Sequence, residues 1–434
     1  MTSTQPTAFR WIILAMVVSA TTINYLDRQI IALLKPVLED EFNWSDRDYG
    51  HVVAAFQFSA ALAYLGVGWF VDRVGVRRGY AISVAVWSAA AMAHAAAKTV
   101  LHFMAARMLL GVAEAANTPA AVKTIAQWFP ARERAFALGW MNSGSNMGAI
   151  VTPLIVPVLA IAFGWQMAFI LTGATGFIWL AVWLAIRRQP TPDASAPAES
   201  APANSLPAGV PPTPAPTSAP IRWRTLLRDR RTWAIAGAKL LTDPVWWFLL
   251  FWLPDFMNRV YGLDLRTFGL PLAAIYSLAT VGALTGGWIP GRMQQRGASL
   301  NTARKMTLLV CALAVVPLPF VLTFSNVWYA VLLVGLALAA HQGFSTNVFA
   351  LATDLFPARV VGSVVGIGAL FGNLGGLAML EFTGWVLDTT GSYWPMFLMC
   401  SVAYLLGLLV IQLLVPKVRA AEPEPPGTVA AMHA

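Results

Sequence analysis

Ionisable side chains occur inside apolar stretches of this sequence. Arg28 follows Asp27 in INYLDRQ, and Glu114 follows Arg107 by seven residues in RMLLGVAEAANTP. A guanidinium stays charged at any working pH and binds a carboxylate through two hydrogen bonds. A carboxyl group in a low-dielectric cavity takes up a proton nearer neutrality than it does in water. These residue types predict a site that binds an organic anion at a fixed cation and protons at neighbouring acids.

The spacing of these residues predicts their directions on helices. Arg107 and Glu114 are two turns apart and project from one face, whereas Asp27 and Arg28 point about 100° apart. Arg107 lies near the outer end of its apolar stretch, which makes it a candidate gate residue. The alternative is that the four residues form only a structural ion-pair network.

The second half of the chain adds polar and aromatic candidates in KLLTDPVWWF. Lys239 either binds an anion or pairs with Asp243 one turn later. Pro244 predicts a break in the helix that frees backbone groups toward a cavity. The aromatic residues Trp246 to Phe248 pack either against a sugar ring or against other helices.

Composition indicates that helices in a lipid bilayer position these groups. Of the 434 residues, 58% are hydrophobic and 11% are charged, and the mean hydropathy is +0.63, whereas soluble domains are about 25% charged. The net charge of +9 therefore indicates basic cytoplasmic loops rather than a nucleic-acid partner. Cys311 and Cys400 both lie in apolar runs, so neither a disulfide framework nor a thiolate metal site is expected.

Twelve apolar runs are long enough to cross a bilayer, which requires about 20 residues each. The runs are 11–33, 50–71, 79–97, 102–122, 135–158, 166–187, 232–257, 268–290, 305–324, 328–350, 361–384 and 393–415. We therefore predict an all-α membrane protein of two pseudo-symmetric six-helix bundles. The predicted parts are an N-terminal bundle at 1–188, a cytoplasmic Pro/Ala-rich linker and basic segment at 189–230, a C-terminal bundle at 231–416 and a disordered cytoplasmic tail at 417–434.

An internal repeat supports this division. Phe-Pro-Ala-Arg occurs at 129–132 and again 227 residues later at 356–359, and at the same offset Gly148 matches Gly375 and Asn146 matches Asn373. The motif falls between the fourth and fifth spans of one half and the tenth and eleventh of the other, as in parallel repeats. The offset also relates His341 to Glu114. His341 is a candidate proton relay, a partner for a sugar hydroxyl, or a satisfied core histidine.

The basic residues predict the orientation. With the N-terminus and the linker on one side, that side holds 21 of the 29 Lys and Arg residues and the other holds five, while Arg28, Arg107 and Lys239 lie within spans. Basic loops face the cytoplasm, so both termini are predicted to be cytoplasmic and the chain to lie in the inner membrane.

The loop between the second and third spans reads GWFVDRVGVRRG. Gly68 is expected to let a neighbouring helix approach closely, and Asp72 to pair with basic groups across the interface of the halves. Arg73, Arg77 and Arg78 either take part in this gate or only anchor the loop. The stretch matches the G-x-x-x-D-R-x-G-x-R-R signature of the major facilitator superfamily.

The whole chain apart from linker and tail resembles the anion:cation symporter family of this superfamily, and within it the bacterial hexuronate and sugar-acid transporters. The segments that carry this resemblance are NYLDR at 24–28, RMLLGVAEAANTPA at 107–120, QWFPARERAFALG at 127–139, GWQMAFI at 164–170, DPVWWFLLFWLP at 243–254 and AHQGF at 340–344.

The resemblance implies symport of protons with a monocarboxylated sugar, driven by the proton gradient without a cofactor, by a functional monomer. It implies that Arg28 binds the carboxylate and that Asp27 and Glu114 carry protons. It also implies, less specifically, that the hydroxyl groups of the sugar are surrounded by Tyr25, Gln342, Asn347 and Asn373. Some hexuronate carriers lack an acid at the position of Asp27, whereas galactonate-type carriers have one, so the exact sugar acid stays open.

Other functions remain as alternatives or are disfavoured. Aromatic acids and other small carboxylates are handled in the wider family, and a multidrug exporter or a transport-dead nutrient sensor are further alternatives. Span five reads GSNMGAIVTP, which lacks the Gly-Pro-rich signature of such exporters. The sequence has no H-E-x-x-H, G-x-S-x-G or P-loop motif, so no enzyme, catalytic residue or metal site is predicted.

Overall fold

The computed structural model describes residues 8–186 and 223–419, which form α-helices and two short 3-10 helices. The N half contains α1 (Ala8–Phe42), α2 (Asp46–Ala63), α3 (Val67–Val74), α4 (Val76–Ala93), η1 (His94–Ala96), α5 (Val100–Glu114), α6 (Asn117–Trp128), α7 (Ala131–Phe163) and α8 (Trp165–Ala185). The C half contains α10 (Arg230–Tyr261), α11 (Gly269–Gln295), α12 (Leu300–Val315), η2 (Leu318–Thr323), α13 (Val327–Leu355), α14 (Ala358–Thr390) and α15 (Trp394–Leu414), preceded by the short α9 (Trp223–Arg228).

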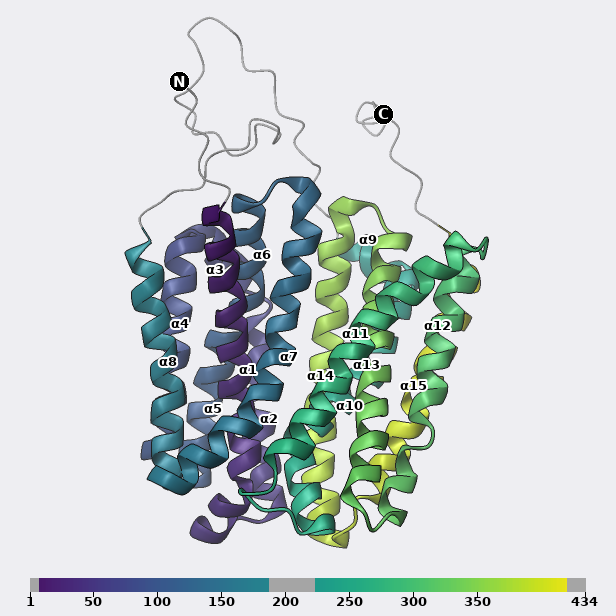
Figure 1. The fold of residues 1–434 in the computed structure, drawn as a ribbon. Helices are drawn as coiled ribbons and strands as arrows, with labels where there is room; N and C mark the ends of the chain where they lie inside the picture. The colour runs from purple at the N-terminus through teal and green to yellow at the C-terminus, as the bar shows by residue number, and fades with distance from the viewer. Residues whose placement is uncertain (1–7, 187–222, 420–434) are drawn as a thin grey trace, which may run out of the picture.

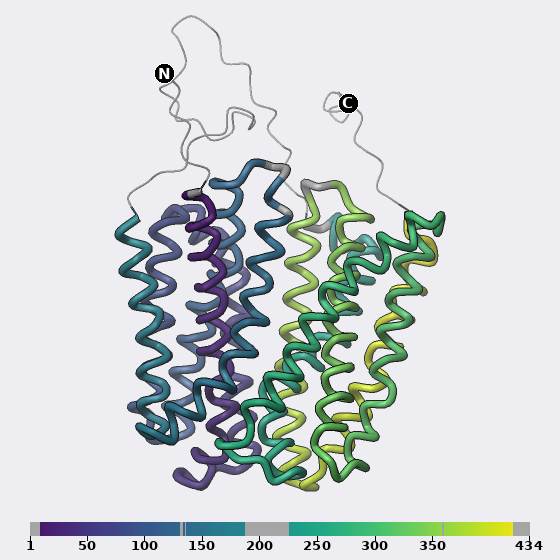
Figure 2. The backbone as a smooth tube through the Cα atoms, in the orientation of Figure 1, coloured from purple at the N-terminus to yellow at the C-terminus, as the bar shows by residue number. Residues whose placement is uncertain are grey.

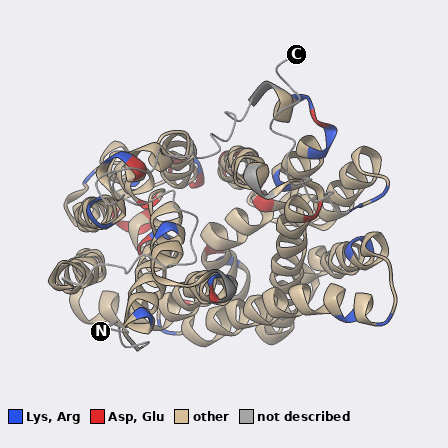
Figure 3. Ribbon diagram, turned by 90° about the horizontal axis from the view of Figure 1, so that it is seen from above, with Lys and Arg blue, Asp and Glu red and all other residues tan. Residues whose placement is uncertain are grey.

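The two halves stand side by side as bundles of roughly parallel helices (Figures 1 and 2). The start of α1 and the ends of α8 and α15 lie at one end of the molecule, at the top of Figure 1, which we call the terminal end. The opposite end is called the far end. Most of the ribbon carries neither acidic nor basic residues (Figure 3), as expected for helices in lipid.

The predicted fold class is confirmed, and the span count needs one qualification. Within the described ranges, ten helices are long and apolar enough to cross a membrane, or eleven if the bent pair α2–α3 is one span. The predicted span 102–122 is covered by α5 and α6, which are separated by Ala115 and Ala116. Pro119, in the first turn of α6, lacks the N–H that would continue the hydrogen-bond ladder. Counting α5 and α6 as one broken span gives the twelve predicted.

The repeated Phe-Pro-Ala-Arg motif performs the same structural task twice. Pro130 is the N-cap of α7 with φ −61° and ψ 152°, and Pro357 is the N-cap of α14 with φ −59° and ψ 146°. Each helix then runs for 33 residues. The motif therefore ends one helix and starts the next at equivalent places in the two halves.

The break predicted at Asp243–Pro244 is absent, because α10 runs without interruption from Arg230 to Tyr261. Pro244 has no N–H to donate to the Leu240 carbonyl. Gly375 of α14 packs against this carbonyl so closely that an added Cβ would lie 2.4 Å from its oxygen. Membrane helices tolerate proline when neighbouring helices cover the freed group.

The predicted linker and tail fall mostly outside the described residues. Of 189–230, the structure describes 223–230, where α9 and the start of α10 lie, and of 417–434 it describes 417–419.

Candidate functional site

Arg28 and Glu114, which are 86 residues apart in the chain, form a buried ion pair. The Nε and Nη2 atoms of Arg28 both donate to Glu114 Oε2, at 3.1 and 3.0 Å. Arg28 Nη2 also donates to Asn24 Oδ1 at 3.1 Å. Arg28 is 7% exposed and Glu114 is 2% exposed. Because α5 ends at Glu114, this carboxylate lies beside the break between α5 and α6.

A small polar cavity of about 90 Å³ opens beside this pair. It is lined by Thr21, Asn24, Tyr25, Arg28, Tyr64, Glu114, Asn117, Thr118, Met141, Asn142 and Ser145. Tyr64, Asn117 and Asn142 were missed in the sequence analysis, because uncharged polar residues in a span are not distinguished by type alone. Asn117 is held by Tyr80, whose hydroxyl donates to Asn117 Oδ1 at 2.7 Å.

Asp27 and Arg107 lie behind this cavity and do not line it. Asp27 is 1% exposed, and neither carboxylate oxygen has a hydrogen-bond partner among the described residues. Arg107 donates from Nη1 to the Arg28 carbonyl at 3.0 Å, while its Nε and Nη2 have no partner within the same ranges. Arg107 is 0% exposed, so it is buried in this structure, and its role as a gate residue stays a prediction.

Three aromatic rings surround the guanidinium of Arg28. Its Cζ lies 4.8 Å from the centre of the Tyr25 ring, 4.9 Å from Phe56 and 5.5 Å from Trp247. Tyr25 and Phe56 belong to the N half and Trp247 to the C half. Arg28 therefore contacts both halves.

Lys239 and Asp243 form the ion pair that was one of the two sequence interpretations. Lys239 Nζ lies 2.8 Å from Asp243 Oδ2, and 4.5 Å from the ring centre of Phe349. Gly372 of α14 gives Asp243 room, since an added Cβ would lie 2.1 Å from its Oδ2. In this structure the charge of Lys239 is therefore neutralised by Asp243, on the same helix.

His341 is engaged inside the C half. Its Nδ1 lies 2.8 Å from the Tyr404 hydroxyl, and its ring stacks on Trp246 at 5.5 Å and 16°. Both residues are buried, so Trp246 contacts His341 rather than Arg28. The neighbouring Gln342 is half-buried on α13.

The two predicted asparagines are placed differently. Asn347 is 0% exposed, donates to the carbonyls of Gly286 and Gly343 at 2.8 and 2.9 Å, and accepts from Arg304 at 3.2 Å, so α11 to α13 use it for packing. Asn373 instead accepts a hydrogen bond of 3.3 Å from Gln57 of α2. Only Asn373 reaches the boundary between the halves.

The predicted gate loop makes its described contacts within the N half. Asp72 pairs with Lys123 of α6 rather than across the halves. A Cβ at Gly68 would meet no atom of the described residues within 4 Å, so among these residues the expected close approach is absent. Arg73 lies 5.4 Å from the Trp69 ring, and Arg77 donates to the Leu184 and Ile186 carbonyls at the end of α8.

A charged cluster at the far end was also missed. Lys35 Nζ lies 2.6 Å from Asp255, 2.9 Å from Asp46 and 2.9 Å from Glu39, and Arg259 lies 2.5 Å from Asp46. We call these five residues the latch cluster. Lys35 falls outside the predicted span 11–33, but α1 extends through it. Asp255 falls near the end of the predicted span 232–257 and was not singled out; it lies within α10.

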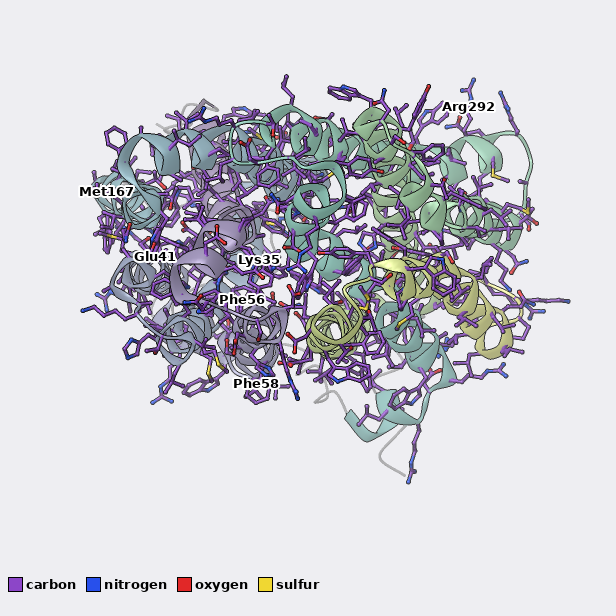
Figure 4. All side chains as sticks on the ribbon, turned by 90° about the horizontal axis from the view of Figure 1, so that it is seen from below. Lys35, Glu41, Phe56, Phe58, Met167 and Arg292 are labelled. Atoms are coloured by element: carbon purple, nitrogen blue, oxygen red, sulfur yellow. The ribbon has the colours of Figure 1, made fainter. Side chains whose placement is uncertain are left out.

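The latch cluster joins the halves, because its first three residues along the chain belong to α1 and α2 and the last two to α10. Figure 4 shows Lys35 from below, near the middle of the molecule, whereas Arg292 lies at the periphery. Three carboxylates, those of Glu39, Asp46 and Asp255, are close enough together to hold a metal ion. The Lys35 ammonium already lies among them.

Comparison with known proteins identifies the chain. Residues 17–380 match the family model of the Major Facilitator Superfamily. The hexuronate transporter of Escherichia coli K12 is 31% identical over 403 residues, 93% of each chain. The galacturonate transporter of Dickeya chrysanthemi is 29% identical over 71% of this chain and 89% of its own length. The D-galactonate transporter of Escherichia coli O6:H1 is 27% identical over 96% of this chain and 97% of its own length.

A solved structure shares the fold. A bacterial homologue of the human lysosomal transporter Spinster, in an inward-facing and occupied conformation, aligns with a TM-score of 0.73 at 17% identity over 95% of this chain and 99% of its own. Taken with the helical architecture and the family match, these relatives show a multi-pass membrane protein of the Major Facilitator Superfamily, to which this chain belongs.

Proposed function

We propose that this chain imports a sugar acid together with protons, by exposing one central site alternately to the two sides of the inner membrane. The names of its relatives, which are transporters of hexuronate, galacturonate and D-galactonate, support this substrate class. The observation that carries the proposal is the buried Arg28–Glu114 pair beside a polar cavity.

Arg28 is the proposed binding group for the substrate carboxylate. Two of its nitrogen atoms currently donate to a single oxygen of Glu114. A substrate carboxylate offers the same acceptors and therefore competes with Glu114 for the guanidinium. A carboxylate is a poor ligand for this site while Glu114 is ionised, because three charged groups would then hold a net negative charge in a buried place.

Protonation of Glu114 resolves this competition. The neutral carboxylic acid releases the guanidinium, and the substrate carboxylate takes its place, so one proton and one anion enter the site together. Asp27 is a second proposed proton site. Its partnerless oxygens lie behind the pair, and a protonated acid costs less to bury without partners than an ionised one.

The fixed guanidinium disfavours the exporter alternative, because a lipophilic cation gains nothing from Arg28 and is repelled by it. Other small carboxylates fit the same cation. Hydroxylated acids are favoured by the amides and hydroxyls that line the cavity, among them Asn24, Asn117 and Ser145.

The test is uptake of labelled glucuronate into proteoliposomes under an imposed pH gradient. The wild type is expected to accumulate it and to lose accumulation when the gradient is dissipated. Glu114→Gln is expected to retain counterflow exchange and lose uphill accumulation, because its amide cannot carry a proton. Uphill transport by Glu114→Gln at the wild-type level contradicts the assigned role.

Arg28→Ala is expected to weaken glucuronate binding about 100-fold or more, roughly 3 kcal/mol, since it removes the anchoring charge. Arg28→Lys keeps the charge and loses the two-pronged geometry, so an intermediate loss is expected. Arg292→Ala, at the exposed periphery (Figure 4), is the matched control and should bind as the wild type does. Equal binding by all three variants contradicts the proposal.

A further inference from the structure

Trp247 lies one residue beyond the position in the C half that Arg28 occupies in the N half. The matched glycines give this register. The nearest atom to a Cβ at Gly148 would be the Thr22 carbonyl oxygen, at 2.6 Å, and the nearest to one at Gly375 would be the Leu240 carbonyl oxygen, at 2.4 Å. Thr22 and Leu240 are thus equivalent in the two halves, and Arg28 and Trp246 follow them by six residues each.

Arg28 and Trp247 face each other across the boundary between the halves, since the Arg28 guanidinium carbon lies 5.5 Å from the centre of the Trp247 ring. A cation therefore lies on one side of the central boundary and an indole ring on the other.

The ring of Trp247 is held in place from behind. Phe251, one turn later on α10, is stacked with it at 6.2 Å and 17°. Gly376 of α14 leaves room for it, because a Cβ there would lie 2.4 Å from Trp247 Cδ1. The same Cβ would lie 3.1 Å from Gln57 Nε2, and Gln57 donates to Asn373. Trp247 is half-buried, and its ring lies against the guanidinium of Arg28, which lines the cavity.

This arrangement combines three recognition elements: a guanidinium, a half-buried indole ring and a pair of side-chain amides. A hexuronate in its ring form presents matching groups. Its carboxylate projects from one end of a six-membered ring, its ring C–H groups form an apolar face, and its hydroxyl groups lie at the rim. Ligand sites pair apolar and aromatic walls with a few polar groups in this way.

An open-chain sugar acid matches less well. Each of its carbons beyond the carboxylate bears a hydroxyl group on a rotatable chain, so it offers no continuous apolar face, and ordering its bonds on binding costs conformational entropy. Building on the proposed function, we propose that Trp247 is a specificity-determining residue that favours ring-form hexuronates over open-chain aldonates.

The test is a binding measurement by calorimetry on the purified full-length chain, with glucuronate as the cyclic probe and gluconate as the open-chain probe. The wild type is expected to bind glucuronate at least tenfold more tightly. Trp247→Leu is expected to lower glucuronate affinity about tenfold and leave gluconate affinity unchanged, and Trp247→Phe, which retains an aromatic face, should keep most of the preference. Trp233→Leu, an exposed tryptophan on the same helix, is the control and should leave both affinities unchanged.

Two results overturn the inference in distinguishable ways. If both acids bind the wild type equally and Trp247→Leu weakens both by the same factor, the selectivity is wrong while the proposed function stands. If a folded wild type, verified by thermal unfolding, binds neither acid, the proposed function itself fails and the inference with it.

Discussion

The two ends of the molecule are held together in different ways. At the far end, Lys35 of α1 binds Asp255 of α10. Beside it, Gly50 of α2 meets Gly384 of α14, where an added Cβ on Gly50 would lie 3.3 Å from the Gly384 Cα. These contacts join the N half to the C half.

At the terminal end the described ion pairs stay inside one half. Asp72 binds Lys123 within the N half, and Arg304 binds Asp354 at 2.8 Å within the C half. Any state that opens the far end must therefore break cross-half contacts, whereas the terminal-end pairs can persist in every state. The far-end contacts are consequently the ones expected to set the balance between states.

One measurement serves the first three predictions. Lys98 and Arg266 are exposed residues in the far-end connections of the N half and the C half. Spin labels at these two positions, in a chain whose Cys311 and Cys400 are replaced by alanine, report the far-end separation as a distance distribution.

Removal of the buried lysine is expected to have the largest effect. Lys35→Met leaves three carboxylates with only Arg259 between them, and breaking a buried ion pair from one side costs about 3–5 kcal/mol. The distribution should shift largely to longer distances. Glu39→Gln is the control. Because the Glu39 side chain is 29% exposed, loss of its charge should shift the distance distribution much less. An unchanged distribution in folded Lys35→Met protein contradicts the role of the latch cluster.

A small steric change should have the next largest effect. In Gly384→Ala the new Cβ would lie 2.9 Å from the Asp46 carbonyl oxygen, and overpacking of this kind costs about 1–3 kcal/mol. Longer far-end distances are expected. Gly366→Ala makes the same substitution on the same helix, but within the part of the chain that the structure describes its Cβ would meet nothing within 4 Å. The two variants should differ, and identical distributions would refute the comparison.

A half-exposed ion pair between the halves should have a smaller effect on the far-end distances. His51 Nδ1 lies 2.7 Å from Glu381 Oε2, with side chains 38% and 40% exposed. Exposed ion pairs are worth about 0–1 kcal/mol, so Glu381→Gln should enlarge the long-distance population by less than fivefold. A shift as large as that of Lys35→Met would show that this pair, and not the latch cluster, dominates.

The smallest far-end effect is expected from the gate loop. Asp72→Asn removes a pair whose two partners both belong to the N half, so the Lys98–Arg266 distances should match those of the wild type. The measurable consequence is a fall in the thermal unfolding temperature of about a degree or two at most, since the side chains of Lys123 and Asp72 are 33% and 69% exposed. A clear change in the far-end distances would show that Asp72 does influence how the two halves separate at the far end.

The fold was predictable because its signals are local or repeated. Runs of apolar residues predict spans whatever they pack against, and the Phe-Pro-Ala-Arg motif identified equivalent helix starts at Pro130 and Pro357. The proximity of Arg28 and Glu114 was also predictable, because charges inside apolar runs have few places to lie other than beside one another.

Other features depend on residues far apart in the chain. Lys35 and Asp255 are separated by 220 residues, and no local pattern joins them. The engagement of Asn347 with the Gly286 carbonyl depends on how closely α11 and α13 approach. The choice between Trp246 and Trp247 depends on a rotation of about 100° along α10, which the aromatic run itself does not reveal.

The placement of Arg28 and Trp247 on opposite sides of the boundary has a consequence for the stereochemistry of the proposed transport. If the C half also presented a guanidinium there, a molecule with an acid group at each end would be held equally well in two opposite orientations. With one guanidinium and one indole ring, we expect a sugar acid to bind with its carboxylate toward the N half. Each of its chiral centres would then meet the same side chains on every turnover, so two sugar acids that differ at a single carbon, such as C4 epimers, would experience different surroundings.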